Sequence, residues 1–157
     1  MVDISRLTAA GRVRARAARA GDEGFAQALY LAMAERLLPE QSRTGARRHF
    51  REVHRRDQSW ILFVGKDQAG WMQVEDSSSL VTLRQIHLLP AYRGKGIGGS
   101  LVGELLEQAR AEGKPVALRV VKGNPALALY ERLGFEVYRE EERRLWMRWP
   151  PGSAVSR

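Results

Sequence analysis

The sequence predicts an α/β protein of the α+β type, with a single mixed, mostly antiparallel sheet and helices on both faces. Three observations predict this class. Hydrophobic residues make up 44% of the 157 residues, which is typical of one globular domain. Apolar residues recur at helical and strand spacings in the order β-α-α-β-β-β-α-β-α-β-β. The strand–helix–strand passage over residues 80–121 requires a right-handed crossover between parallel strands, and all other neighbours are expected to be antiparallel.

The first elements are an edge strand and two helices. Residues 13–17 alternate small or apolar residues with arginine, which is typical of a short edge strand. A helix follows, with Asp22 as its N-cap and Pro39 as its stop. Its apolar stripe is Phe25, Leu29, Met33 and Leu37.

A second helix is predicted over residues 42–56. Its apolar face holds Ala46, Phe50 and Val53, and its other face holds Arg47, Arg48, Arg51, Arg55 and Arg56. We expect this arginine-rich face to be exposed to solvent, and the alternative is that it binds an acidic substrate or RNA.

Three antiparallel strands are predicted next. Residues 60–64 and 71–75 form a hairpin around the turn at residues 65–70. After a second turn at residues 76–79, the third strand covers residues 80–89.

The C-terminal half alternates helices with strands. A glycine-rich loop over residues 93–99 leads into a helix that Gly113 ends. The apolar stripe of that helix is Ile97, Leu101, Val102, Leu105, Leu106 and Ala109. The strand over residues 116–121 is apolar at most positions, so both of its faces are expected to be buried. Asn124 caps a further helix that Gly134 closes, and the predicted last strands cover residues 135–138 and 144–149.

Short polar or irregular segments lie at both ends. Residues 1–11 and 150–157 are predicted to be disordered tails around a single domain over residues 12–149. No apolar stretch approaches the ~20 residues that cross a bilayer, and residues 1–11 lack the apolar core of a signal peptide. We therefore expect a soluble, cytoplasmic protein with no membrane partner.

Composition excludes several kinds of site. The chain has no cysteine, which excludes disulfides, thiolate zinc sites and a cysteine nucleophile. Its three histidines, His49, His54 and His87, are not spaced with carboxylates as metal ligands, so no metal is expected. The net charge of +8 favours polyanionic binding partners, such as nucleic acid or an anionic cofactor.

The loop Arg93-Gly94-Lys95-Gly96-Ile97-Gly98 has the chemistry of an anion site. The first N–H groups of a helix lack intrahelical acceptors, and the helix dipole places partial positive charge there. Glycines let the backbone approach a ligand closely, and Arg93 and Lys95 add full charges. A pyrophosphate would fit. The loop lacks the Gly-Lys-Ser/Thr ending of a P-loop, and no ribose-binding acid ends the next strand.

A second motif about thirty residues later makes the pattern specific. It runs Asn124-Pro125-Ala126-Leu127-Ala128-Leu129-Tyr130 and continues to Gly134-Phe135. Together with the loop and the preceding Leu88-Leu89-Pro90, it resembles the GNAT superfamily of acyl-CoA-dependent N-acyltransferases. The close resemblance covers residues 80–138, and the N-terminal third matches only in its element order.

The resemblance implies acetyl-CoA as co-substrate, held where two neighbouring parallel strands splay apart. Main-chain groups of His87, Leu88 and Leu89 would bind the pantetheine arm as an added strand. The N–H groups of Arg93, Gly94, Lys95, Gly96, Ile97 and Gly98 would bind the pyrophosphate. Asn124 would lie near the pantetheine as well as capping its helix.

The resemblance also implies catalytic roles. Tyr130 would be the general acid toward the leaving thiolate, and the main-chain N–H near Leu88 would stabilise the oxyanion. The general base stays open between Glu75, His87 and a water chain. In some relatives a glutamate lies five positions before the asparagine, but Arg119 stands there in this chain.

The sequence thus predicts an N-acetyltransferase that moves an acetyl group from acetyl-CoA to a primary amine by direct attack in a ternary complex. The acceptor would be a small molecule or a peptide or protein amine. A homodimer would be compatible with the resemblance, although no feature demands one. Two alternatives remain: an acyl-CoA-binding protein of this fold without transferase activity, and a basic nucleic-acid-binding module. Nucleic acid is the less favoured partner, because no recognised nucleic-acid motif is present.

Overall fold

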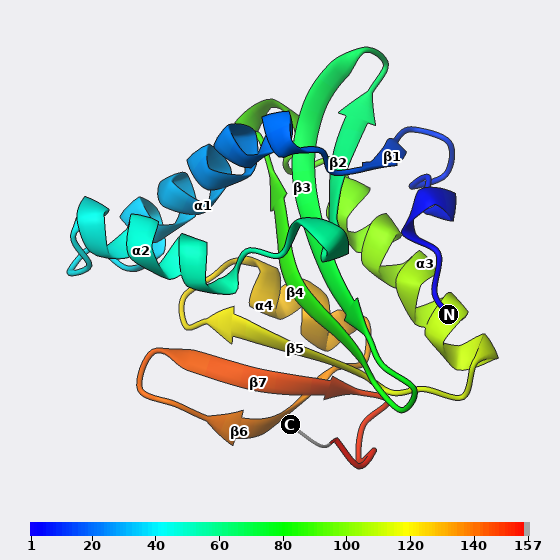
Figure 1. Cartoon of the computed structure of the whole chain (residues 1–157). Helices are drawn as coiled ribbons and strands as arrows, with labels where there is room; N and C mark the ends of the chain where they lie inside the picture. The colour runs from blue at the N-terminus through cyan, green and yellow to red at the C-terminus, as the bar shows by residue number, and fades with distance from the viewer. Residues whose placement is uncertain (156–157) are drawn as a thin grey trace.

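One seven-stranded sheet runs through the computed structural model, which describes residues 1–155 (Figure 1). Its strand order is β1-β2-β3-β4-β5-β7-β6. The strands are β1 (Arg14–Ala17), β2 (Ser59–Val64), β3 (Asp67–Asp76), β4 (Val81–Leu88), β5 (Val116–Val121), β6 (Glu136–Glu140) and β7 (Arg144–Trp149). All neighbours in this sheet are antiparallel except β4 and β5. The predicted mixed sheet with one parallel pair is confirmed.

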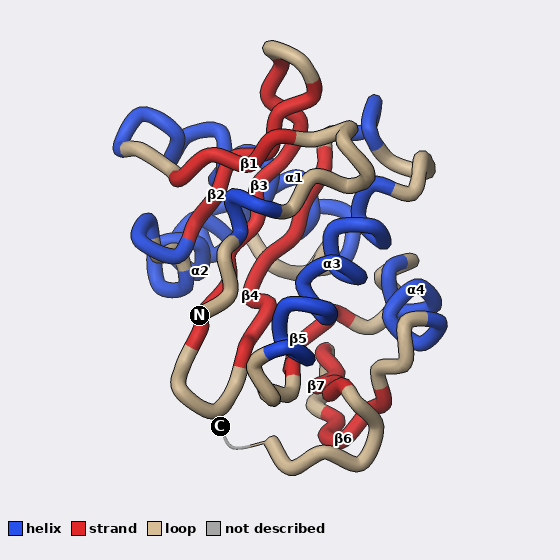
Figure 2. Tube along the Cα trace, turned by 90° about the vertical axis from the view of Figure 1, so that its right-hand side faces the viewer, coloured by secondary structure: helices blue, strands red, loops and turns tan. Residues whose placement is uncertain are grey.

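Two pairs of helices cover opposite faces of the sheet (Figures 1 and 2). They are α1 (Glu23–Leu37), α2 (Arg43–Val53), α3 (Ile97–Ala111) and α4 (Ala126–Arg132), and four short 3-10 turns accompany them. Helices α1 and α2 pack on one face around Phe50 and Trp71. Helices α3 and α4 pack on the other around Leu101, Leu105 and Met147. No helix within residues 1–155 is long and apolar enough to span a membrane.

The two parallel strands form a fork. β4 and β5 pair only over Val81–Val116, Thr82–Ala117 and Leu83–Leu118. Beyond Leu83, β4 continues to Leu88, and no strand within residues 1–155 pairs with it on that side. The edge of β4 beyond the branch point therefore offers main-chain groups to a ligand.

A β-bulge in β4 begins near the branch point. Gln73 of β3 pairs with Gln85, but Val74 pairs with Leu83, so Arg84 is an extra residue. One extra residue turns all later side chains to the other face. As a result Ile86 and Leu88 pack on the α3 side together with Leu83. His87 instead lies on the α1 side, a position that strict alternation would not allow.

The N-terminal segment differs from the expected disordered tail. Ile4–Arg6 form a 3-10 turn, and Ile4, Leu7 and Ala9 are buried against the α3 side of the core. The side chains of Gln108 and Glu104 on α3 accept hydrogen bonds from main-chain N–H groups of this segment. Three apolar residues are too few to show a period in the sequence, but a neighbouring helix buries them. At the other end, residues 150–155 form a turn and coil, and residues 156–157 of the predicted tail lie outside the described chain.

Two boundaries and one cap also differ from the sequence expectations. α2 ends at Val53 rather than at residue 56, and the hairpin turn is only Gly65 and Lys66. Asp22 stands at the N-cap of α1, but its carboxylate does not bond the helix. Instead Asp22 accepts two hydrogen bonds from the Arg16 guanidinium, which lowers the pKa of Asp22. The same carboxylate accepts a hydrogen bond from the Arg19 main-chain N–H at 2.7 Å, so it caps the preceding 3-10 turn and not α1.

Candidate active site

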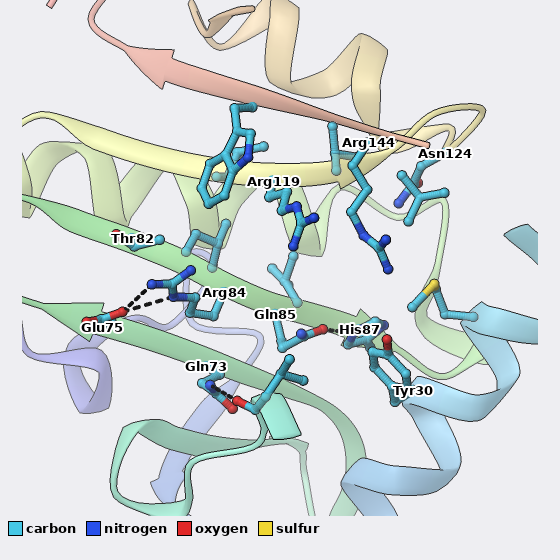
Figure 3. Close-up of a pocket in the computed structure, with 18 of the residues that line it drawn as sticks. Tyr30, Gln73, Glu75, Thr82, Arg84, Gln85, His87, Arg119, Asn124 and Arg144 are labelled. Carbon is cyan, nitrogen blue, oxygen red and sulfur yellow. Dashed lines mark hydrogen bonds and ion pairs between the residues drawn. The ribbon is translucent and has the colours of Figure 1, made fainter. Parts of the chain in front are cut away.

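A cavity of about 400 Å³ opens where β4 and β5 diverge (Figure 3). Its walls include residues from both faces of the sheet. Tyr30 of α1 and His49 of α2 line it from one side, and Tyr130 of α4 lines it from the other. Since Tyr130 belongs to the core on the α3 side, the cavity passes through the fork. The cavity brings Glu75, His87, Asn124 and Tyr130 together, and all four were expected at the site.

The free edge of β4 points the right main-chain groups into the fork. The Leu89 N–H donates to the Ala69 carbonyl on the β3 side, 2.8 Å away. Main-chain groups alternate in direction along an antiparallel strand, so those of Leu88 face the β5 side. The Leu88 carbonyl accepts a hydrogen bond from Arg93 Nε at 2.9 Å. Its N–H is therefore directed to the place where an added strand or a thioester carbonyl would lie.

The glycine-rich loop lies just beyond the fork, at the start of α3. Gly94 and Gly96 have φ angles of 71° and 81°, a region that other residues enter at a cost. A Cβ added at Gly94 or Gly98 would meet nothing within 4 Å, so the loop backbone is open to a ligand. Arg12 Nη1 donates to the Lys95 carbonyl at 2.6 Å and holds the loop from the N-terminal segment.

Tyr130 carries a protonated phenol into the fork. Its side chain is only 6% exposed, and its ring packs against Phe135. Burial raises the pKa of Tyr130 to about 12. The hydroxyl is therefore a proton or hydrogen-bond donor at any physiological pH.

Asn124 performs the capping role and also lines the cavity. Its Oδ1 accepts a hydrogen bond from the Ala126 N–H at 2.9 Å, which satisfies a free donor at the start of α4. The carboxamide nitrogen makes no hydrogen bond within residues 1–155.

His87 is held as a neutral ring. It stacks on Trp71 with centroids 5.4 Å apart, and its Nε2 lies 2.7 Å from Gln85 Oε1. Burial, together with the charges of Arg36 and Arg93, lowers the pKa of His87 to about 4. The Gln85 oxygen can only accept, so Nε2 carries the proton and Nδ1 is left as a lone pair.

Glu75 lies farther from the fork. It stands opposite Thr82, where β4 and β5 are still paired. Its Oε1 accepts hydrogen bonds from Arg84 Nε and Nη2, at 2.9 and 2.6 Å (Figure 3). This ion pair with Arg84, the bulge residue, occupies Oε1 of the carboxylate.

A sequence model described as the Acetyltransferase (GNAT) family matches residues 23–135, which is most of the chain. The chain belongs to this family.

Curated relatives of this GNAT protein match parts of the chain. The mycothiol acetyltransferase of Corynebacterium glutamicum is 42% identical over 80 residues, which cover 49% of this chain and 27% of that protein. The L-methionine sulfoximine/L-methionine sulfone acetyltransferase of Pseudomonas aeruginosa is 33% identical over 92 residues, or 51% of this chain and 53% of that protein. The matches thus span about half or less of these relatives.

Solved structures show the same fold. The PaiA N-acetyltransferase of Thermoplasma acidophilum, crystallised with coenzyme A, superposes with a TM-score of 0.70. The match covers 87% of this chain and 97% of that one at 16% identity, so it establishes the GNAT fold alone.

The structure adds wall residues to this GNAT site that the sequence did not single out. Tyr30 lies outside the stripe predicted for its helix, because α1 is apolar on most sides and buries Ala26, Leu29 and Tyr30 together. Arg144 opens the last strand and pairs with Val121 at the end of β5. Only the strand order brings it beside the fork. No periodic signal in the sequence could have found either residue.

Proposed function

We propose that the protein transfers an acetyl group from acetyl-CoA to a primary amine. The observation that carries the proposal is the fork itself. The main-chain N–H of Leu88 and the protonated phenol of Tyr130 both lie at the fork, and the cavity extends from there to the α1–α2 side. A thioester placed in the fork would have the acceptor on one side and a donor for its leaving sulfur on the other.

The residues present fit the CoA part of the donor. The unpaired edge of β4 suits the pantetheine amides as an added strand. The glycine loop, open at Gly94 and Gly98, suits the pyrophosphate, because it leads into the first N–H groups of α3 and contains Arg93 and Lys95. Asn124 has an unused carboxamide N–H pair beside the fork.

The proposed reaction is direct attack in a ternary complex. The amine nitrogen bonds to the acetyl carbon, and the Leu88 N–H stabilises the oxyanion that forms. The carbon–sulfur bond then breaks, and the thiolate receives a hydrogen bond from Tyr130. Complete transfer from a phenol with a pKa of about 12 to a thiolate with a pKa near 8.5 is uphill. The role assigned to Tyr130 is therefore mainly hydrogen-bond donation as negative charge grows on sulfur.

The amine must lose a proton before or during attack. Of the three open routes, the ionic state of the cavity favours water. Glu75 is paired with Arg84, and the low pKa of His87 makes it a weak base. The proton that the ammonium loses to become the free base would therefore leave through solvent in the open cavity. The second proton, released from nitrogen as the amide forms, would leave by the same route and balance the charge of the departing thiolate.

The named relatives are compatible with an amine acceptor. One acts on L-methionine sulfoximine and L-methionine sulfone, and another on the alanine of ribosomal protein bS18. Their acceptors differ in size, so the relatives support acetylation of an amine but do not identify which amine. The acceptor class has to be argued from the residues of this cavity.

The first test is calorimetric titration with acetyl-CoA, beside CoA and desulfo-CoA. We expect micromolar binding that weakens at least tenfold in Gly96→Val. Gly103→Ala is the matched control, because Gly103 lies inside α3, has no positive φ and has open space around it. Absence of binding in the wild type would refute the proposal.

One alternative has an observation in its favour. An acyl-CoA-binding protein without transferase activity would need no base, and the one carboxylate of the cavity wall is already paired. A thiol-release assay over a panel of amines separates the two. Turnover that Tyr130→Phe lowers by about 100-fold supports transfer, whereas tight binding with no turnover in the wild type supports the alternative.

A further inference from the structure

Two arginines line the cavity from β5 and β7. Figure 3 shows the side chains of Arg119 and Arg144 pointing from these strands into the cavity, toward Tyr30 and His87. Burial lowers the pKa of His49, and the charge of Arg144 lowers it too; Arg144 also opposes the burial-driven rise in the pKa of Tyr30, so its charge acts on both groups.

Within residues 1–155 Arg144 has no anionic partner, unlike Arg84 and Arg119; Arg55, also without a carboxylate partner, instead donates to the main-chain carbonyls of Glu52 and His54. Arg84 is bound by Glu75, and Arg119 is bound by Glu141, with Nη2 and Oε1 2.7 Å apart. Within residues 1–155, no carboxylate lies within ion-pairing distance of Arg144. A guanidinium directed into a pocket without a counter-ion is a site for one that arrives with a ligand.

The phenol opposite Arg144 is also left without a strong partner. The Tyr30 hydroxyl is buried and has no partner within hydrogen-bond limits in the described chain, although the Arg144 guanidinium lies near enough to act on its pKa as a donor. A buried hydroxyl without a partner costs stability, and such groups are uncommon in folded proteins. A ligand carboxylate could accept hydrogen bonds from the Tyr30 hydroxyl and from the Arg144 guanidinium together.

The whole wall carries excess positive charge. Four arginines line the cavity against a single glutamate: Arg55, Arg84, Arg119 and Arg144 against Glu75. A like charge nearby disfavours the protonated form of an amine and lowers its pKa. The cavity therefore repels polyamines, while it favours the reactive free base of an amine that an attached anion has brought in.

We propose that the acceptor is a small primary amine that carries a carboxylate, of the amino-acid class, and that Arg144 with Tyr30 binds this carboxylate. The inference rests on the proposed acetyl transfer and names the substrate class of the same site. A planar carboxylate matches the two parallel N–H donors of a guanidinium, whereas a carboxamide or an amine without the acid leaves Arg144 unpaired.

The test compares each acid with its own amide. Acetyl-CoA binding is measured first by calorimetry, as for the proposed function. Thiol release is then measured with α-, β- and γ-amino acids, each beside the matching carboxamide. We expect kcat/KM to be about 10- to 100-fold higher for the acid of at least one pair, the worth of a charge-assisted contact.

Variants assign that preference to Arg144. Arg144→Met should raise KM for the acid and leave its amide nearly unchanged, which a merely structural role would not do. Arg144→Lys should retain part of the preference for the acid over its amide, because lysine keeps the positive charge but lacks the two parallel N–H donors of a guanidinium. Arg143→Ala is the matched control, since Arg143 is adjacent but pairs with Glu40 outside the cavity wall.

The outcomes are distinguishable. If acetyl-CoA binds but no acid is acetylated, or the acids react no faster than their amides, this inference is overturned and the cofactor site stands. If the preference survives in Arg144→Met, the assignment to Arg144 is wrong. If acetyl-CoA does not bind, the proposed function fails and the acceptor class fails with it.

Discussion

His87 should make the folded protein sensitive to acid. The pKa of its ring is about 4 in the folded state, and an unfolded histidine has a pKa of about 6.5. Because the folded value is the lower one, the unfolded chain takes up this proton first as the pH falls. The contribution of His87 to the free energy of unfolding is therefore complete above pH 6.5 and is lost as the pH falls toward 4.

The size of the loss follows from the shift. Each pKa unit is worth about 1.4 kcal/mol, so His87 should contribute about 2.5 kcal/mol less at pH 4.5 than at pH 8. For a chain of this length, 1 kcal/mol moves Tm by about 2–4 °C. The share of His87 in the acid shift of Tm is then about 5–10 °C.

Urea unfolding followed by circular dichroism at pH 8 and pH 4.5 measures this share. The two variants His87→Gln and His87→Phe remove the titration, the first keeping a polar side chain beside Gln85 and the second keeping an aromatic ring on Trp71. Burial also lowers the pKa values of His49 and His54, so the wild type should lose more stability than His87 alone explains. The difference between wild type and either variant isolates the His87 term.

A clear result would refute this reasoning. If both variants lose as much stability between pH 8 and pH 4.5 as the wild type, His87 titrates normally in the folded state. It would then not be the desolvated ring between Trp71 and Gln85, and the face assignment that follows from the bulge at Arg84 would be wrong.

Three further predictions concern the site. Tyr130→Phe should lower kcat by about 100-fold and leave the calorimetric Kd for acetyl-CoA nearly unchanged, whereas an equal loss of binding would argue against a role in the chemical step. Gly96→Ala should cost about 1–2 kcal/mol in urea unfolding because of the φ of 81°, and Gly103→Ala should cost nothing. Gly70→Ala should cost at least 2 kcal/mol, because its Cβ would overlap the His87 carbonyl and lie 2.8 Å from Leu88 Cδ2; wild-type stability would show that β3 and β4 are farther apart.

Local sequence patterns were sufficient to predict the order of the helices and strands and the family. Strand and helix periods, with glycines at the turns, predicted the element order and the parallel crossover. The two spaced motifs led to GNAT membership, and the family match confirms it. They also named Tyr130 and Asn124, which the structure places in the wall of one cavity. Their roles there remain proposals.

Tertiary structure alone decided which side chains meet in the cavity. A single extra residue at Arg84 turns His87 to the α1 side, and no local preference marks that register shift. Residues 4–9 are buried only because α3 lies beside them. Tyr30 and Arg144 are over one hundred positions apart, and they face each other because β7 pairs with β5 and α1 covers the same face. Periodicity along the chain reports which elements form and which faces are apolar. The composition of a site formed between distant elements depends on long-range pairing, and the sequence encodes that pairing only through the packing of the whole fold.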